Sequence, residues 1–396
     1  MSVTPVDSSK GHSDWKFVVG LFVASRLLVA AVAVLGPLLL NTDTRFKGRI
    51  TEIGWKAYVG VWDVGWYGNV ASTGYRFGEG SPSNIAFFPL FPLVLRALNG
   101  LGLDLNTAGF LFSNACFAAA LWLFFKIVLR ETGLRDTAER ATALLAFSPA
   151  AVWFCLGLTE SLFLLLTLGL ATAAHRKGWG TMLGIGILAG LTRPNGFVLA
   201  VPAIVLVWSQ ISAELRERRW RSLSGLALVV SGPIIGAGLF FVYLRIMFGS
   251  WSSFQKVNAA QWHNGISVSW ETLAQRIPGV GLRLFNSPTI YVGHVAWSWT
   301  FVLAAGLIAA IALWEYRSRA WHGVMLATFF AFHAFLYQGI TPVGPIARYA
   351  AVVPAFYIGL ALFAEHRKWA QPAVLAASVT ALVIQTAMVF GGYHLN

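Results

Sequence analysis

The sequence has little charge and almost no cysteine. Of 396 residues only 11% are charged, whereas a soluble protein carries roughly 25%. Hydrophobic residues make up 57%. A chain so poor in charge cannot expose most of its surface to water, so we predict an integral membrane protein with several spans. The two cysteines, Cys116 and Cys155, lie inside apolar runs and offer neither a disulfide framework nor a zinc-binding spacing.

Several ligand-binding motifs are also missing. The sequence has no Walker loop and no glycine-rich dinucleotide fingerprint. It has no Asp-x-Asp pair for a metal-bound nucleotide sugar, and no histidine pair at helical spacing for a metal. We therefore expect no cofactor and no divalent metal. Any chemistry on the outer side has to use a donor available in the membrane, such as a lipid-linked one.

Basic residues exceed acidic ones, with a formal net charge of +13. They form short clusters between apolar runs, which is typical of loops that orient a chain in a bilayer and does not indicate nucleic-acid binding. The clusters at 176–177, 216–221, 317–319 and 367–368 all lie inside if the N-terminus is cytoplasmic. We predict a cytoplasmic tail at 1–16 in a multi-pass protein of the plasma membrane.

The apolar runs predict an all-α fold of about eleven transmembrane helices in one domain. The expected spans are Phe17–Leu40, Thr107–Leu129, Ala141–Leu158, Ser161–Ala174, Trp179–Thr192, Phe197–Ile211, Leu223–Phe248, Val292–Trp314, His322–Gln338, Ala350–Ala364 and Pro372–Phe390. Ile85–Leu98 is short and holds two prolines, so we expect it to re-enter the membrane or lie at its interface. Long outer loops with short interfacial helices are expected at 41–84 and 249–291.

One outer acid lies among aromatic residues. Asp63 is flanked by Trp62, Trp66 and Tyr67 in the first outer loop. Aromatic rings at the interface partly exclude water, which raises the proton affinity of a carboxylate, and they also stack on sugars. Asp63 could therefore take a proton from a hydroxyl nucleophile. The alternative is an interfacial helix anchored by tryptophan, in which the acid is incidental.

Two turns between apolar runs carry further candidates. Glu160 lies between two spans, where an ionisable group is costly and often functional. Alternatively, Thr159 or Glu160 caps the following helix. Arg193 opens a turn that also holds Asn195, and an arginine there can grip a lipid phosphate through two parallel bonds. The alternative is an ordinary Pro-Asn-Gly turn whose arginine reaches toward the headgroups.

The later part of the chain offers fewer candidates. Arg348 and Tyr349 stand at the start of a span, so another arginine faces outward. His263 lies beside Gln261 and Trp262 in the second long loop. A lone histidine of this kind is more often structural than a ligand.

These residues, in this order, resemble a known family. Trp62-Asp63-x-x-Trp66-Tyr67, Gly74-Tyr75 and Phe87-Phe88-Pro89-Leu90-Phe91-Pro92 resemble the signature of the PIG-V-like mannosyltransferases. That family is related to GPI mannosyltransferase II and is part of the GT-C superfamily of membrane glycosyltransferases. Thr159-Glu160-Ser161 and Arg193-Pro194-Asn195-Gly196 look like its acidic tip and arginine turn, and Gln261-Trp262 and Arg348-Tyr349 resemble later landmarks.

The resemblance implies an inverting GT-C glycosyltransferase that moves mannose from a polyprenyl-phosphate donor to a glycolipid or glycan acceptor on the outer face. It implies Asp63 as the catalytic residue. The substrate-binding candidates are Trp62, Trp66, Tyr67, Glu160, Arg193, Asn195, Gln261, Trp262, His263, Arg348 and Tyr349. The alternative from another class is a lipid or solute transporter or flippase, in which Glu160 and Arg193 are charges in a translocation path.

Overall fold

Helices dominate the structure, a computed structural model that describes residues 8–39, 52, 54–78, 83–261, 264–265, 290–333, 338–339, 346–365, 367 and 369–390. The helices are α1 (Ser8–Leu39), α3 (Lys56–Val59), α4 (Val64–Thr73), α5 (Leu90–Gly100), α6 (Leu105–Thr132), α7 (Arg135–Ala146), α8 (Glu160–His175), α9 (Trp179–Gly190), η1 (Pro194–Leu199), α10 (Ala200–Leu206), α11 (Trp208–Arg216), α12 (Trp220–Val230), α13 (Gly232–Phe248), α14 (Ser253–Gln261), α16 (Ile290–Glu315), α17 (Ala320–Ala331), α18 (Ile346–Ala350), α19 (Pro354–Glu365) and α20 (Ala370–Phe390). Two short strands, β1 (Asn264–Gly265) and β2 (Gln338–Gly339), pair antiparallel.

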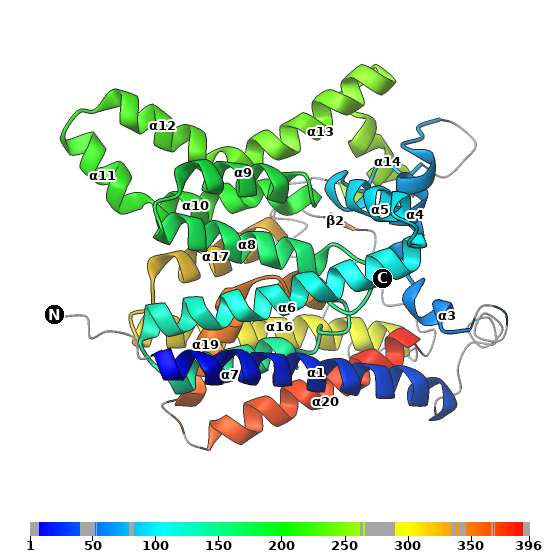
Figure 1. Ribbon diagram of the computed structural model, residues 1–396, viewed down its shortest axis with the longest axis horizontal. Helices are drawn as coiled ribbons and strands as arrows, with labels where there is room; N and C mark the ends of the chain where they lie inside the picture. The colour runs from blue at the N-terminus through cyan, green and yellow to red at the C-terminus, as the bar shows by residue number, and fades with distance from the viewer. Residues whose placement is uncertain are drawn as a thin grey trace.

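The long helices run side by side as a bundle (Figure 1). One row of neighbours leads from α20 through α1, α6, α8 and α9 to α13, and α7, α19 and α16 pack beside it. Among the described helices, three are long and apolar enough to cross a membrane, or up to five if each of two bent pairs forms one span. The predicted all-helical membrane fold is confirmed, and the number of spans stays a prediction.

Helices α9 and α13 approach each other through glycine. Gly186 and Gly190 of α9 lie against the start of α13, where Gly232 and Gly236 have the same spacing. A Cβ atom at Gly190 would lie only 2.1 Å from the carbonyl oxygen of Pro233. Small residues at this spacing let membrane helices pack backbone to backbone. The contact fixes the end of α9 and therefore the turn that follows it.

The predicted span Ala141–Leu158 is wrong. Helix α7 ends at Ala146, and residues 147–159 form a series of turns and bends. Pro149 explains the break, because proline cannot donate a helical hydrogen bond and disfavours helix in the residue before it. Hydropathy alone could not locate this break, since the segment remains apolar beyond it.

Side chains of α1 and α6 satisfy the carbonyl groups of this 147–159 segment. The three pairs are Arg26 to Ala151 (3.2 Å), Ser113 to Leu158 (3.0 Å) and Asn114 to Cys155 (2.9 Å). Non-helical backbone is tolerated at membrane depth only where the protein supplies such partners. The polar residues within two apolar helices are explained by this requirement.

Two other predicted spans are broken helices. Leu223–Phe248 consists of α12 and α13, which are bent by 58° where Gly232 and Pro233 start the second helix. Phe197–Ile211 consists of η1, α10 and α11, again with a bend of 58° before α11. Helix α1 also begins earlier than predicted, at Ser8, within the expected tail.

The short segments near the first long loop agree better with the prediction. Within the predicted segment 85–98, the first five residues form turns and bends and α5 begins at Leu90. The 11 residues of α5 rise about 16 Å, too little to cross a hydrocarbon core of about 30 Å. The loops predicted at 41–84 and 249–291 hold the short helices α3, α4 and α14. Their location at a membrane interface stays a prediction.

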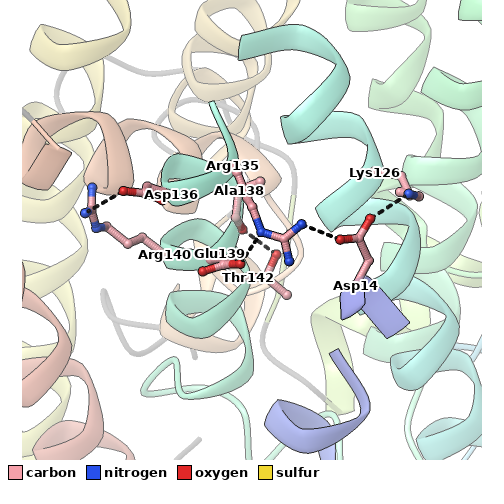
Figure 2. A network of polar contacts seen from close by, with 8 residues as sticks. All are labelled: Asp14, Lys126, Arg135, Asp136, Ala138, Glu139, Arg140 and Thr142. Carbon is pink, nitrogen blue, oxygen red and sulfur yellow. Dashed lines mark hydrogen bonds and ion pairs between the residues drawn. The ribbon is translucent and has the colours of Figure 1, made fainter. Parts of the chain in front are cut away.

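The basic loops that we assigned to the cytoplasm lie at one end of the bundle. Asp14 of α1 accepts hydrogen bonds from Lys126 (3.0 Å) and Arg135 (2.6 Å), which connects α1, α6 and α7 (Figure 2). Arg140 of α7 pairs with Glu365 at the end of α19. Helices α4, α5 and α14 lie at the opposite end (Figure 1). Which end faces the cytoplasm stays a prediction.

We predict that Ser72, exposed on α4, faces outward and that Ser212 faces the cytoplasm, because the short basic loops lie on the side of Ser212. In a background without Cys116 and Cys155, Ser72→Cys should react with a membrane-impermeant maleimide on intact cells. Ser212→Cys should react only after lysis. The opposite labelling pattern would reverse the orientation and move Asp63 to the cytoplasmic side.

Candidate active site

Asp63 stands directly before α4 on a strained turn. Trp62, the residue before it, has a φ of 60°, a conformation that costs energy for a non-glycine residue and often occurs at functional sites. The backbone carbonyl of Asp63 accepts the first hydrogen bonds of the helix, from Trp66 (3.0 Å) and Tyr67 (3.1 Å). Its carboxylate makes no capping bond to α4. It accepts a hydrogen bond from Arg348 instead.

Two carboxylates and two guanidinium groups form one connected ion network. Arg348 of α18 donates through Nη1 to Oδ2 of Asp63 (2.6 Å) and through Nε to Oε1 of Glu160 (2.5 Å). Arg193, just before η1, donates through Nη1 to the same Glu160 oxygen (3.0 Å). The network joins four separate segments of the chain at one point. The sequence predicted all four to face outward: Glu160 and Arg193 from turns, Arg348 from the start of a span, and Asp63 from the first outer loop.

Glu160 is the buried centre of this network, with 0% of the residue exposed. Burial alone raises the pKa of a carboxyl group, but the positive charges of Arg348 and Arg193 bring the pKa of Glu160 below its ordinary value. The group therefore stays ionised. The alternative that Thr159 caps α8 through its side chain is wrong, because no such capping bond forms.

Aromatic rings pack against both guanidinium groups. The guanidinium carbon of Arg348 lies 5.3 Å from the ring centroid of Trp153, and that of Arg193 lies 5.3 Å from the ring of Tyr349. Both distances suit a cation–π contact. Trp153 in turn meets Trp62 edge to face at 5.4 Å. Trp62 is therefore linked to the ion network through Trp153.

A cavity of about 120 Å³ lies beside the network, with polar and aromatic residues in its wall. Six of the predicted site residues line it: Asp63, Tyr67, Arg193, Asn195, Arg348 and Tyr349. The hydroxyl of Tyr67 lies 3.4 Å from Thr159 Oγ1. Burial and the nearby carboxylate of Asp63 raise the pKa of Tyr67, so it acts as a neutral phenol.

The other predicted residues lie around the cavity or outside the described chain. Glu160 lies behind the two arginines, and Trp66 stacks on Phe87 at 5.7 Å. Gln261 accepts a hydrogen bond from the backbone amide of Ser83 (3.0 Å), which ties α14 to the segment before α5. Trp262 and His263 lie outside the described residues. Their predicted roles remain untested.

Two polar residues of the cavity wall were missed by the sequence analysis. Asn258 of α14 and His333, which follows α17, both line the cavity. Neither is part of a recognised motif, and neither is an acid or an arginine. Only folding brings them next to Asp63. In the described part of the chain, no cluster of three or more His, Cys, Asp or Glu side chains is arranged to hold a metal ion.

Residues 21–180 match the model of a family described as mannosyltransferase (PIG-V). GPI alpha-1,6-mannosyltransferase 2 of Rattus norvegicus is 32% identical over 150 residues, which cover 35% of this chain and 29% of the rat protein. The Mus musculus protein of the same name is 34% identical over 151 residues, with the same two coverages. GPI mannosyltransferase 2 of Drosophila pseudoobscura pseudoobscura is 25% identical over 199 residues, which cover 46% of this chain and 43% of that protein.

The resemblance to PIG-V-like mannosyltransferases is therefore confirmed over the first part of the chain, which holds Asp63 and Glu160. The matched stretches span less than half the length of each curated relative. Among solved structures, the oligosaccharyltransferase of Archaeoglobus fulgidus covers 94% of this chain and 53% of its own, with 12% identity and a TM-score of 0.45. A second structure of that protein, tethered to an acceptor peptide, covers 96% of this chain and 55% of its own, with 13% identity and a TM-score of 0.49.

We predict that Glu160→Gln destabilises the protein by about 3–5 kcal/mol, because it leaves buried Arg193 without its described carboxylate partner and leaves Arg348 with Asp63 alone. The measurement is thermal unfolding of the purified protein in detergent. Asp63→Asn is the matched control, since the Asp63 side chain is 27% exposed and its loss leaves Arg348 paired with Glu160. An equal loss of stability in the two variants would contradict this assignment.

Proposed function

We propose that this chain is an inverting mannosyltransferase that uses a polyprenyl-phosphate mannose donor on the extracytoplasmic face of the plasma membrane. The observation that carries the proposal is the arrangement of Asp63, Arg348 and Arg193 on one cavity. It presents a candidate base and two cations to the same small space. The match of residues 21–180 to mannosyltransferases supports mannose as the sugar.

The two arginines suit the phosphate of the donor. Each guanidinium group carries five N–H donors in a planar fork. The described bonds to carboxylates occupy one nitrogen of Arg193 and two of Arg348. Further donors are therefore available for phosphate oxygens. A lipid-linked donor also fits a protein whose apolar helices surround the site.

In the proposed reaction, a hydroxyl oxygen of the acceptor attacks the anomeric carbon of the mannose. The hydroxyl proton passes to Asp63 as the new bond forms. The bond between the anomeric carbon and the phosphate oxygen breaks, and its electron pair stays on the phosphate. Arg193 and Arg348 stabilise the charge that develops there. A phosphate is a weak base, so the leaving group needs no strong general acid.

The acceptor is a glycolipid or glycan that offers one hydroxyl group at the cavity. Purified protein in detergent should transfer radiolabel from synthetic polyprenyl-phosphate mannose to one of a panel of such acceptors. The product should be heavier by one hexose and inverted at the anomeric carbon. Transbilayer movement of a labelled lipid in vesicles, without any sugar transfer, would instead support the transporter alternative.

We expect Asp63→Asn to lower turnover by about 10²–10⁴-fold, the usual effect of removing a general base. The amide keeps the shape of the side chain but cannot take up the proton. Donor binding, measured by titration with the labelled lipid, should persist. Near-normal turnover in Asp63→Asn would show that this residue is not the general base and only forms part of the cavity wall.

We also expect Arg193→Lys to weaken donor binding by about 10- to 100-fold, because the ammonium group keeps the charge but loses the planar fork. Arg96→Lys is the matched control: Arg96 lies on α5 at the same end of the bundle and donates to the carbonyl of Ala71 (2.8 Å). Donor affinity that falls equally in both variants would argue against a phosphate site at Arg193.

A further inference from the structure

Three turns at one end of the bundle hold a basic residue in the left-handed backbone conformation. Lys177, Arg218 and Arg317 follow α8, α11 and α16, each two residues after the end of its helix, with φ angles of 54°, 53° and 47°. Apart from Trp62, they are the only non-glycine residues with a positive φ in the described part of the chain. All three turns point toward the end of the bundle where α1 begins, and the turn between α11 and α12 reaches out beyond the other helices (Figure 1).

The three turns close their helices through the same pair of backbone hydrogen bonds. The amide of the left-handed residue donates to the carbonyl three residues earlier, at 3.0 Å for Lys177, 3.2 Å for Arg218 and 3.0 Å for Arg317. The next amide donates to the carbonyl five residues before it, at 2.9, 3.0 and 2.9 Å in the same order. The left-handed position of this motif is usually glycine, because a Cβ atom there crowds the following carbonyl oxygen.

The chain uses glycine after other helices. Gly133 after α6 and Gly249 after α13 occupy the left-handed region, with φ angles of 70° and 71°. A helix dipole does favour a cation near the C-terminus of a helix, but a basic residue in the last helical turn would supply that charge without strain. Strain of this kind is concentrated at functional sites, and the proposed reaction at the opposite end of the bundle gives these residues no role.

The three basic side chains are exposed, and none forms an ion pair with a described carboxylate. A tryptophan accompanies each turn: Trp179 and Trp220 begin the helices after the first two, and Trp314 precedes the left-handed residue of the third by three positions. Trp220 and Trp314 are 66% and 80% exposed. Tryptophan is enriched where a membrane protein meets the headgroups of the bilayer. The exposed tryptophans indicate that the three cations lie near lipid phosphates.

Two of the turns are fixed to each other by a buried carboxylate. Glu131, near the end of α6, has a side chain that is 2% exposed and lies 3.0 Å from Nε2 of His175 and 2.8 Å from Nε2 of His322. His175 is the last residue of α8, just before the turn of Lys177, and His322 lies in the first turn of α17, just after the turn of Arg317. These two turns therefore keep a defined position relative to each other.

We propose that Lys177, Arg218 and Arg317 bind the phosphate groups of anionic phospholipids, so that this end of the bundle is a docking surface for a negatively charged leaflet. Basic residues at a membrane surface are attracted to anionic headgroups, and the attraction falls as ionic strength rises. The orienting role of basic loops accounts for the sign of the charge but not for its position on strained residues. The proposal goes beyond the proposed reaction and is independent of it, because no residue of the cavity takes part.

The test measures binding of a fluorescent phosphatidylglycerol to the purified protein in a neutral detergent, with phosphatidylcholine carrying the same label as the reference. The unmodified protein should prefer phosphatidylglycerol. The triple variant Lys177→Gly, Arg218→Gly and Arg317→Gly should lose this preference, with affinity for phosphatidylglycerol falling about 5-fold for each charge removed. Its unfolding temperature without lipid should not fall, since glycine adopts a positive φ without strain.

The control variant removes the same charge from exposed residues at the opposite end of the bundle, through Arg76→Gln, Arg245→Gln and Lys256→Gln. It should bind phosphatidylglycerol as the unmodified protein does. An equal loss in the control would show that only the total charge matters, and would overturn the proposal.

The remaining outcomes are equally decisive. If the glycine variant keeps its affinity for phosphatidylglycerol, the proposal is wrong, and a lower unfolding temperature would then assign the three cations to stabilising the helix ends. If the glycine variant does not fold, the corresponding glutamine variant, which removes the charge and keeps the strain, should show the same loss of affinity. Displacement of the labelled lipid by excess soluble glycerol phosphate would assign the turns to a free phosphate ester and overturn the lipid assignment.

Discussion

A single buried carboxylate organises one end of the bundle. Glu160 binds Arg193 and Arg348, which lie 33 and 188 residues away in the sequence, through one oxygen atom. It is also the first residue of α8, where the helix dipole favours a negative charge. Two buried guanidinium groups could not approach each other without this counter-charge. The geometry of the cavity therefore depends on a residue that lies behind it.

The break after α7 makes this placement possible. A continuous helix over 141–158 would leave no room for a turn that delivers Glu160 into the interior. The 147–159 segment instead crosses the core as a series of turns, whose backbone bonds such as that from Trp153 to Ala150 span three residues. Trp153 within it packs on Arg348. The cost of this segment is offset by donors on other helices, such as Ser113 and Asn114 of α6. The polar residues of the apolar helices and the ion network are thus parts of one arrangement.

Much of the site could be predicted from the sequence because ionisable groups are rare in such an apolar chain. Asp63 stood out among the aromatic residues of the first outer loop, and Arg193 and Arg348 stood out at the ends of apolar runs. The structure brings all three to one cavity. The bounds of uninterrupted helices such as α8 and α9 were also close, since hydropathy reports burial directly. What spacing could not show is depth. Glu160 resembles a surface turn in the sequence, and His333 resembles any histidine in an apolar run.

The charge balance of the network indicates how a donor phosphate would enter under the proposed function. Two carboxylates already balance the two arginines, so an added phosphate brings excess negative charge, which weakens the hold of the arginines on one of the carboxylates. Glu160 is fully buried and shared by both arginines, whereas Asp63 is partly exposed and binds only Arg348 among the described contacts. Asp63 is therefore the carboxylate that would separate from its arginine under the proposed function. The carboxylate would become available as a base only when the donor occupies the site, which links proton transfer to donor binding without any larger change in the fold.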